Sequence, residues 1–285
     1  MNAWAVVPVL STLVAWGVAV SVLKWAPGQR VSRRLAVLLF VEGTAVFTTE
    51  FALLFLVESE TVATRISLVH AGADLLVLCL YLPFLGAALD VPPVRAFRSR
   101  AAAIALAVLG LVGLGAIVAF PSAFVAGSFP MPPEEPVRWM FEWGDAWQVL
   151  AVGLVAMYTL GLTASVVALR RAHTDLARRR ARVFLWAFGT RDLVWGGIYL
   201  IAMVWGNIIM PTGLAWLGQF YAGSLLVYSV LVGYGILTVQ LLDIDLKLRW
   251  TIKQGTSLYL PPMIYHEAFA AYQDNFLPFA RTRVR

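Results

Sequence analysis

Seven long apolar segments constrain the fold of this chain more than any other feature. A helix that crosses the hydrocarbon core of a bilayer needs roughly 20 mostly apolar residues. Because a backbone in lipid must satisfy its own hydrogen bonds, each such segment is expected to be helical. The sequence therefore predicts an all-α bundle of seven transmembrane helices, a multi-pass protein of the cell membrane. The predicted spans are 3–23, 35–57, 66–89, 101–120, 147–169, 183–205 and 214–241.

The composition excludes the soluble classes. Hydrophobic residues make up 60% of the 285 residues and charged residues only 13%, about half the usual charged fraction of a soluble domain. The single cysteine, Cys79, excludes a disulfide scaffold. The lipid bilayer is therefore the expected partner of most of the surface.

The basic residues predict the orientation. Of the 22 Lys and Arg residues, 19 fall in the first, third and fifth connections and after the seventh span. The opposite connections carry only Arg65 and Arg138, together with the acids Glu58, Glu60, Glu134, Glu135, Glu142 and Asp145. By the positive-inside rule the N-terminus lies outside and the C-terminus in the cytoplasm. The net charge of +6 is then expected to lie mainly on the cytoplasmic face, next to anionic lipid, and no nucleic-acid partner is expected.

The longest outer connection, 121–146, contains five prolines and the aromatic residues Trp139, Phe141 and Trp143. One interpretation is a stiff loop whose tryptophans sit at the level of the lipid headgroups. The other is a lid over a pocket that opens outward.

Ionisable side chains inside the spans are the main functional candidates, because each costs at least about 2.5 kcal/mol on insertion scales. A helix rise of about 1.5 Å per residue places them in two layers. The inner layer is a predicted network of buried charges, Glu42, Arg191 and Asp192. The outer layer is a predicted ligand or cation pocket, Glu50, His70 and Asp74.

The charge balance leaves several interpretations open. Four carboxylates face one guanidinium, so some carboxyls hold a proton, or a cation or water compensates them. The group could be a structural polar network that joins helices, a binding pocket, or a proton or ion pathway. Two carboxylates and a histidine could also bind a divalent metal, but no spacing fixes their geometry, and the metal is left undecided.

Two further spans carry weaker signals. In 214–241, Tyr221 and Tyr228 share one helical face, which makes them candidate walls of the pocket. The segment 101–120 has no polar side chain, and Gly110, Gly113 and Gly115 could permit close helix approach or a homodimer.

Enzyme and cofactor signatures are missing from the sequence. The span 214–241 has no lysine for a retinal Schiff base. There is no Gly-rich phosphate loop, no HExxH and no GxSxG. The sequence therefore predicts a protein that is not an enzyme and holds no cofactor.

The stretch GYGILTVQLLDIDLKLRWTIKQGT, residues 233–256, follows the last span. Its part 242–256 is predicted to be an amphipathic helix at the membrane surface, followed by a cytoplasmic tail, 257–285. The stretch resembles the exit of the seven-helix membrane domain of bacterial and archaeal sensor histidine kinases, and of related uncharacterised prokaryotic seven-span proteins. That resemblance implies a link to a cytoplasmic signalling partner, although no kinase domain follows the stretch here.

These observations together predict a sensor or receptor-like membrane module. It would bind a small ligand, proton or cation in the outer half of the bundle and signal to a cytoplasmic partner. The alternative is a transporter or ion-conducting protein that uses the same carboxylates. A third interpretation is a structural subunit whose polar groups only hold helices together.

Overall fold

The computed structural model describes residues 3–26, 28–132, 134, 138–205 and 211–239. The chain divides into two units, Met1–Ile244 and Asp245–Arg285, and all described residues belong to the first. The predicted surface helix 242–256 and the predicted tail 257–285 lie outside the described residues.

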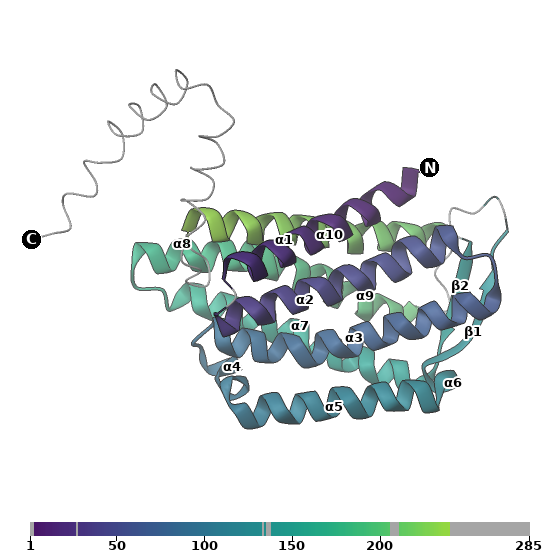
Figure 1. The fold of residues 1–285 in the computed structure, drawn as a ribbon, viewed down its shortest axis with the longest axis horizontal. Coiled ribbons are helices and arrows are strands. Elements are labelled where there is room, and N and C mark those ends of the chain that lie inside the picture. The colour runs from purple at the N-terminus through teal and green to yellow at the C-terminus, as the bar shows by residue number, and fades with distance from the viewer. Residues whose placement is uncertain (1–2, 27, 133, 135–137, 206–210, 240–285) are drawn as a thin grey trace, which may run out of the picture. The chain divides into compact units, whose positions relative to one another are not determined.

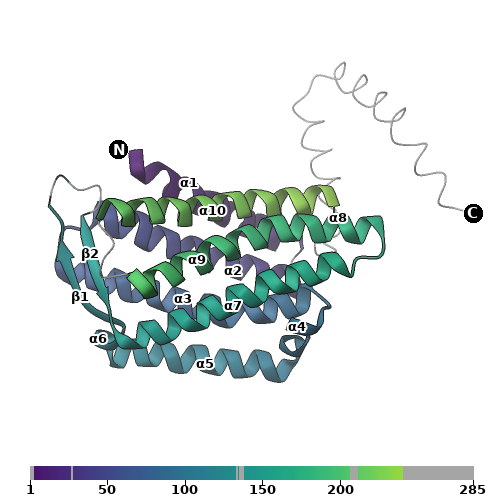
Figure 2. The same cartoon turned by 180° about the vertical axis from the view of Figure 1, so that it is seen from behind.

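The described chain is mainly helical, which confirms the all-α class. Its long helices run side by side in alternating directions (Figures 1 and 2). The helices are α1 (Val6–Trp25), α2 (Arg30–Val46), α3 (Glu60–Ala88), α4 (Pro92–Arg95), α5 (Arg100–Ala119), α6 (Pro121–Phe124), α7 (Asp145–Arg170), α8 (Asp175–Phe184), α9 (Thr190–Trp205) and α10 (Pro211–Val239). Short 3-10 turns cover Ala3–Ala5 and Ala96–Arg98.

Two π-helical segments interrupt the regular helices. Phe47–Leu56 continues α2, and Leu185–Gly189 joins α8 to α9. The wider π turn changes which side chains share a face, and such segments often occur at functional sites. Glu50 lies in the first segment, and Arg191 lies two residues after the end of the second.

Six helices in the described part of the chain are long and apolar enough to cross a membrane: α1, α2 with the start of its π segment, α3, α5, α7 and α10. The predicted span 183–205 is not among them. It is divided between the end of α8, the π segment and α9, which alone has only 16 residues. The arginines of α8 and the pair Arg191–Asp192 lower the apolar character of this rod.

Part of the connection 121–146 is a β-hairpin rather than an irregular loop. Strand β1 (Val125–Pro130) pairs antiparallel with β2 (Trp139–Trp143), with an irregularity between Val125 and Gly127. Aromatic residues favour strands, which gives a physical reason for β2. Trp139 Nε1 donates to the carbonyl of Val57 at 3.0 Å, so the hairpin is attached to the connection between α2 and α3.

Short polar side chains fix where helices begin. The hydroxyls of Ser59, Ser99 and Thr174 accept hydrogen bonds from backbone N–H groups in the first turns of α3, α5 and α8. These N-caps satisfy donors that have no partner inside the helix.

Helix α3 is the central helix and α5 the peripheral one. The apolar part of α3 is 72% buried, whereas that of α5 is 11% buried. Gly110 and Gly113 let α5 approach α3, because a Cβ at Gly113 would overlap the side chain of Leu75. The predicted close helix approach therefore occurs within one chain, while Gly115 faces open space and the homodimer stays a prediction.

Candidate functional site

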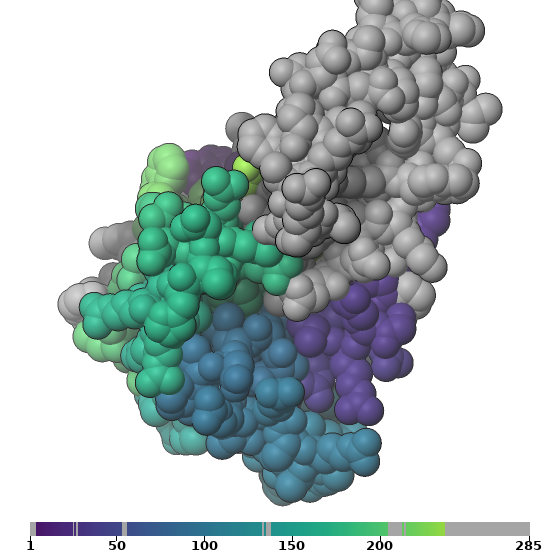
Figure 3. Space-filling view, turned by 90° about the vertical axis from the view of Figure 1, so that its left-hand side faces the viewer, coloured from purple at the N-terminus to yellow at the C-terminus, as the bar shows by residue number. Residues whose placement is uncertain are grey.

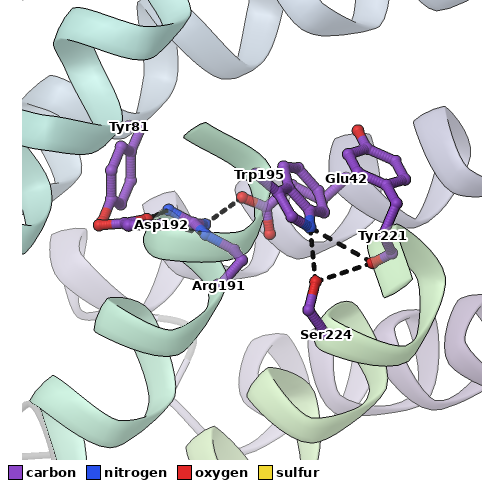
Figure 4. A network of polar contacts seen from close by, with 7 residues as sticks. All are labelled: Glu42, Tyr81, Arg191, Asp192, Trp195, Tyr221 and Ser224. Carbon is purple, nitrogen blue, oxygen red and sulfur yellow. Dashed lines mark hydrogen bonds and ion pairs between the residues drawn. The ribbon is translucent and has the colours of Figure 1, made fainter. Parts of the chain in front are cut away.

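Arg191 is the centre of a fully buried ion network. Its side chain has no exposed surface, nor does that of Glu42. The guanidinium donates from Nη1 to Glu42 Oε1, and from Nη2 to Asp192 Oδ1 at 2.6 Å. Figure 4 shows the three side chains converging between α2 and α9. The structure thus brings together the residues predicted for the inner layer.

Aromatic rings surround the guanidinium of Arg191. The ring centroids of Tyr81 and Tyr228 lie 4.2 and 5.0 Å from its Cζ, within the range of cation–π contacts. The Tyr81 hydroxyl donates to Asp192 Oδ2 at 2.6 Å. Tyr228 therefore packs against the charge network and is not among the described residues that line the cavity below. Tyr221 and Tyr228 lie on one face of α10 at different levels, so their spacing alone could not separate them.

A second polar group joins α3 to its neighbours. His70 Nε2 lies 3.3 Å from Asp74 Oδ2, as expected for neighbours four residues apart on a helix. The Tyr199 hydroxyl on α9 donates to Asp74 Oδ1 at 2.6 Å. On the other side, Thr49 Oγ1 lies 3.4 Å from His70 Nδ1. This group links the π segment after α2, α3 and α9.

A cavity of about 120 Å³ lies beside this second group. Three of the predicted wall residues, Glu50, His70 and Tyr221, line it. Asp74 is not among the lining residues; it is only 1% exposed, and its carboxylate contacts His70 and Tyr199. The other lining residues are Thr49, Met140, Phe141, Trp143, Trp147, Ile198, Tyr199, Ala202, Leu217 and Gly218.

The hairpin contributes one wall of the cavity through Met140, Phe141 and Trp143 of β2. The indole of Trp143 stacks on Trp147 with centroids 4.4 Å apart and planes at 8°. The Phe141 ring packs edge-on against Trp143 at 4.6 Å. These aromatic residues belong to the connection 121–146, and they form part of the cavity wall.

Gly218 makes room for the Glu50 carboxylate. A Cβ built on Gly218 would overlap Glu50 Oε2. A side chain at this position of α10 would therefore displace the only acidic group in the cavity wall among the described residues. Nothing in the sequence distinguishes Gly218 from other glycines in the spans.

We expect Gly218→Ala to change the cavity without unfolding the protein, since the overlapping atoms belong to the end of a flexible side chain. The carboxylate of Glu50 must move, and binding of any ligand that contacts it should weaken about tenfold. Gly223→Ala is the matched control on the same helix, because its Cβ would approach only Val7, at 4.0 Å. Equal ligand affinity in the two variants, measured by titration in detergent, would contradict this role of Gly218.

The cavity and the ion network are connected by stacked rings. Tyr221, in the cavity wall, stacks on Trp195 with centroids 4.2 Å apart. Trp195 in turn lies 5.6 Å from Arg191 Cζ and donates from Nε1 to Ser224 Oγ at 2.8 Å (Figure 4). The spacing of apolar residues in the sequence does not predict that Trp195 lies between Tyr221 and Arg191. Only the tertiary packing shows this contact.

The described residues contain no group of three His, Cys, Asp or Glu side chains that could hold a metal ion. No family model matches the chain, and a comparison with proteins of curated function gives no match.

Proposed function

We propose that this protein is a seven-span membrane sensor or receptor-like module. A small ligand binds in the cavity beside Glu50, and the change is passed through Trp195 and the Arg191 network to α10 and a cytoplasmic partner. The observation that carries the proposal is the stacking of the cavity residue Tyr221 on Trp195. The resemblance of residues 233–256 to the exit of sensor-kinase membrane domains supports the same direction of signalling.

The placement in the membrane is part of the proposal. The rod formed by α8, its π segment and α9, which contains the predicted span 183–205, would cross the membrane beside the six apolar helices. Exposed arginines gather at the end of the bundle where α8, α4 and the beginning of α2 lie, which Figure 3 views directly. Five of the seven exposed acids among the described residues lie at the hairpin end, namely Glu58, Glu60, Glu134, Glu142 and Asp145, whereas Asp90 and Asp175 lie at the other end. This separation supports a cytoplasmic α8 end and an outer hairpin.

The ion network supplies an element that a ligand can bias. One guanidinium is shared by two carboxylates on two helices, Glu42 on α2 and Asp192 on α9. A shift of Trp195 changes the ring that packs against Arg191, and with it the balance between the two ion pairs. Packed interiors respond to such shifts by switching between discrete arrangements, because they are not continuously deformable.

The first experiment separates binding from transport. The full chain is purified in detergent and titrated with a panel of small amines, acids and neutral compounds while its thermal midpoint is followed. A sensor should show saturable stabilisation that is lost in Glu50→Gln and retained in Glu142→Gln, an exposed carboxylate of β2 outside the cavity wall. Uptake of the stabilising compound into liposomes, lost in Glu50→Gln or Asp74→Asn, would instead establish the transporter alternative.

The second experiment tests coupling. An environment-sensitive fluorophore is attached to the cysteine of the Tyr234→Cys variant, on the exposed face of α10. The label is selective for this position because the native Cys79 is buried. Ligand should change its emission in the parent protein. In Trp195→Leu the ligand should still bind, since Trp195 is not among the residues lining the cavity, but the emission change should disappear. An unchanged response in Trp195→Leu would contradict signalling through this ring.

A further inference from the structure

We propose that the cavity recognises a small organic ammonium cation that carries an oxygen acceptor close to its charged nitrogen, the chemical class of choline and related amino alcohols. The inference rests on the proposed function, in that the cavity is taken as a ligand site. It adds the chemistry of the ligand.

The charge of the wall selects a cation. Glu50 provides a carboxylate, and no Lys or Arg is among the described residues that line the cavity. His70, the other ionisable group of the wall apart from tyrosines, is already paired with Asp74 and Thr49. An anionic ligand would meet Glu50 without a compensating cation, whereas an ammonium group would form a charge-assisted contact with it.

The aromatic content of the wall favours an organic cation over a metal ion. Five rings line the cavity: Phe141, Trp143, Trp147, Tyr199 and Tyr221. Rings of this kind attract alkylated ammonium groups through their negative faces, as in aromatic cages. A small metal ion instead requires several oxygen ligands to replace its hydration shell, and the wall offers few.

One buried polar atom in the wall is without a partner. Within the described residues, Trp147 Nε1 makes no hydrogen bond, although the residue is only 3% exposed. Buried donors without a partner are rare in folded proteins, and an indole N–H can only donate. A ligand oxygen near the ammonium group would accept from Trp147. This unpaired N–H of Trp147 is the reason for including an acceptor in the ligand.

The size of the cavity limits the ligand. A volume of about 120 Å³ corresponds to about four water molecules at the roughly 30 Å³ that each occupies in the liquid, so only a compact ligand fits. Choline falls in this range, and its uncharged isostere 3,3-dimethylbutan-1-ol has the same shape with a carbon in place of the nitrogen.

The test measures the binding of choline and of 3,3-dimethylbutan-1-ol to the full chain in nanodiscs by calorimetric titration. Choline should bind saturably and at least about tenfold more tightly than the neutral isostere. Glu50→Gln should weaken choline roughly 10–100-fold and leave the isostere unchanged. The control Glu142→Gln should bind both compounds as the parent does.

Two variants test the rings and the acceptor separately. Trp143→Leu keeps an apolar wall but removes one ring, and it should weaken choline more than the isostere. Trp147→Phe keeps a ring but removes the N–H, and it should weaken choline while leaving tetramethylammonium, which has no oxygen, unchanged. Thermal midpoints show which variants are folded. If Trp143→Leu does not fold, the Glu50→Gln variant alone tests whether the cavity prefers a cation.

The outcomes distinguish the two proposals. Equal affinity for choline and its isostere, or an unchanged choline affinity in Glu50→Gln, overturns the ammonium inference and leaves the cavity as a site for another ligand. Binding of an organic anion in place of choline would also overturn the ammonium inference. No binding of choline, isostere or any compound of the wider panel overturns the proposed function as well.

Discussion

Arg191→Met should destabilise the protein by about 3–5 kcal/mol, the range found when one partner of a buried ion pair is removed. Methionine is close to arginine in length, so the loss is mainly that of charge. Glu42 and Asp192 would be left buried without their shared cation, since both are essentially inaccessible to solvent. The Tyr81 and Tyr228 rings would also lose their cation–π partner.

The measurement is the free energy of unfolding in mixed micelles, with two comparisons. Arg95→Met removes an arginine whose pair with Asp90 is 3.4 Å long and 61% exposed at Arg95, and it should cost less than about 1 kcal/mol. In the double variant Arg191→Met/Glu42→Gln the loss should be smaller than the sum of the single losses, because one uncompensated charge is gone. Strict additivity would mean that the Arg191–Glu42 contact carries no coupling energy.

Gly161→Ala should be the second most damaging of the changes considered, at about 1–3 kcal/mol for overpacking. Gly161 lies on α7 directly against the ion network. An added Cβ would overlap Asp192 Oδ2 and lie 2.7 Å from the Tyr81 hydroxyl. The methyl group must therefore separate these two groups, which are joined by a hydrogen bond of 2.6 Å.

Gly197→Ala is the matched control for this change, because a Cβ there has nothing within 4 Å. It should be neutral or stabilising by up to about 1 kcal/mol, since alanine restricts the unfolded chain more than glycine does. Thermal midpoints of the two variants, measured in the same detergent, give the comparison. A Gly161→Ala protein as stable as Gly197→Ala would mean that α7 can move away from Asp192 at no cost.

The two layers of charge show how far sequence reasoning reaches. Helix rise places Glu42 and Arg191 at the same depth, and they meet in the structure. Depth does not define the angle around a helix, however, and the π segments at Phe47–Leu56 and Leu185–Gly189 change that angle in ways that periodicity does not predict. Asp74 shares its depth with Glu50 and His70, but the rotation of α3 keeps it out of the cavity wall and against Tyr199.

The hairpin gives a second example. The prolines and tryptophans of 121–146 were compatible with both a headgroup belt and a lid. The choice depends on where β2 packs, and its residues Met140, Phe141 and Trp143 contact the cavity because Trp139 attaches the strand to Val57. Contacts between segments more than 80 positions apart leave no local pattern in the sequence.

The sequence by itself determined the helical class and six of the segments that are apolar enough to cross a membrane, because backbone hydrogen bonding and hydrocarbon thickness act on each segment locally. It also identified the ionisable side chains whose burial requires partners. Only the tertiary structure decided which partners meet, that Gly218 leaves room for Glu50, and that Trp195 links the cavity to Arg191. Those features depend on helix rotation and close packing between distant segments, which hydrophobicity and spacing do not encode.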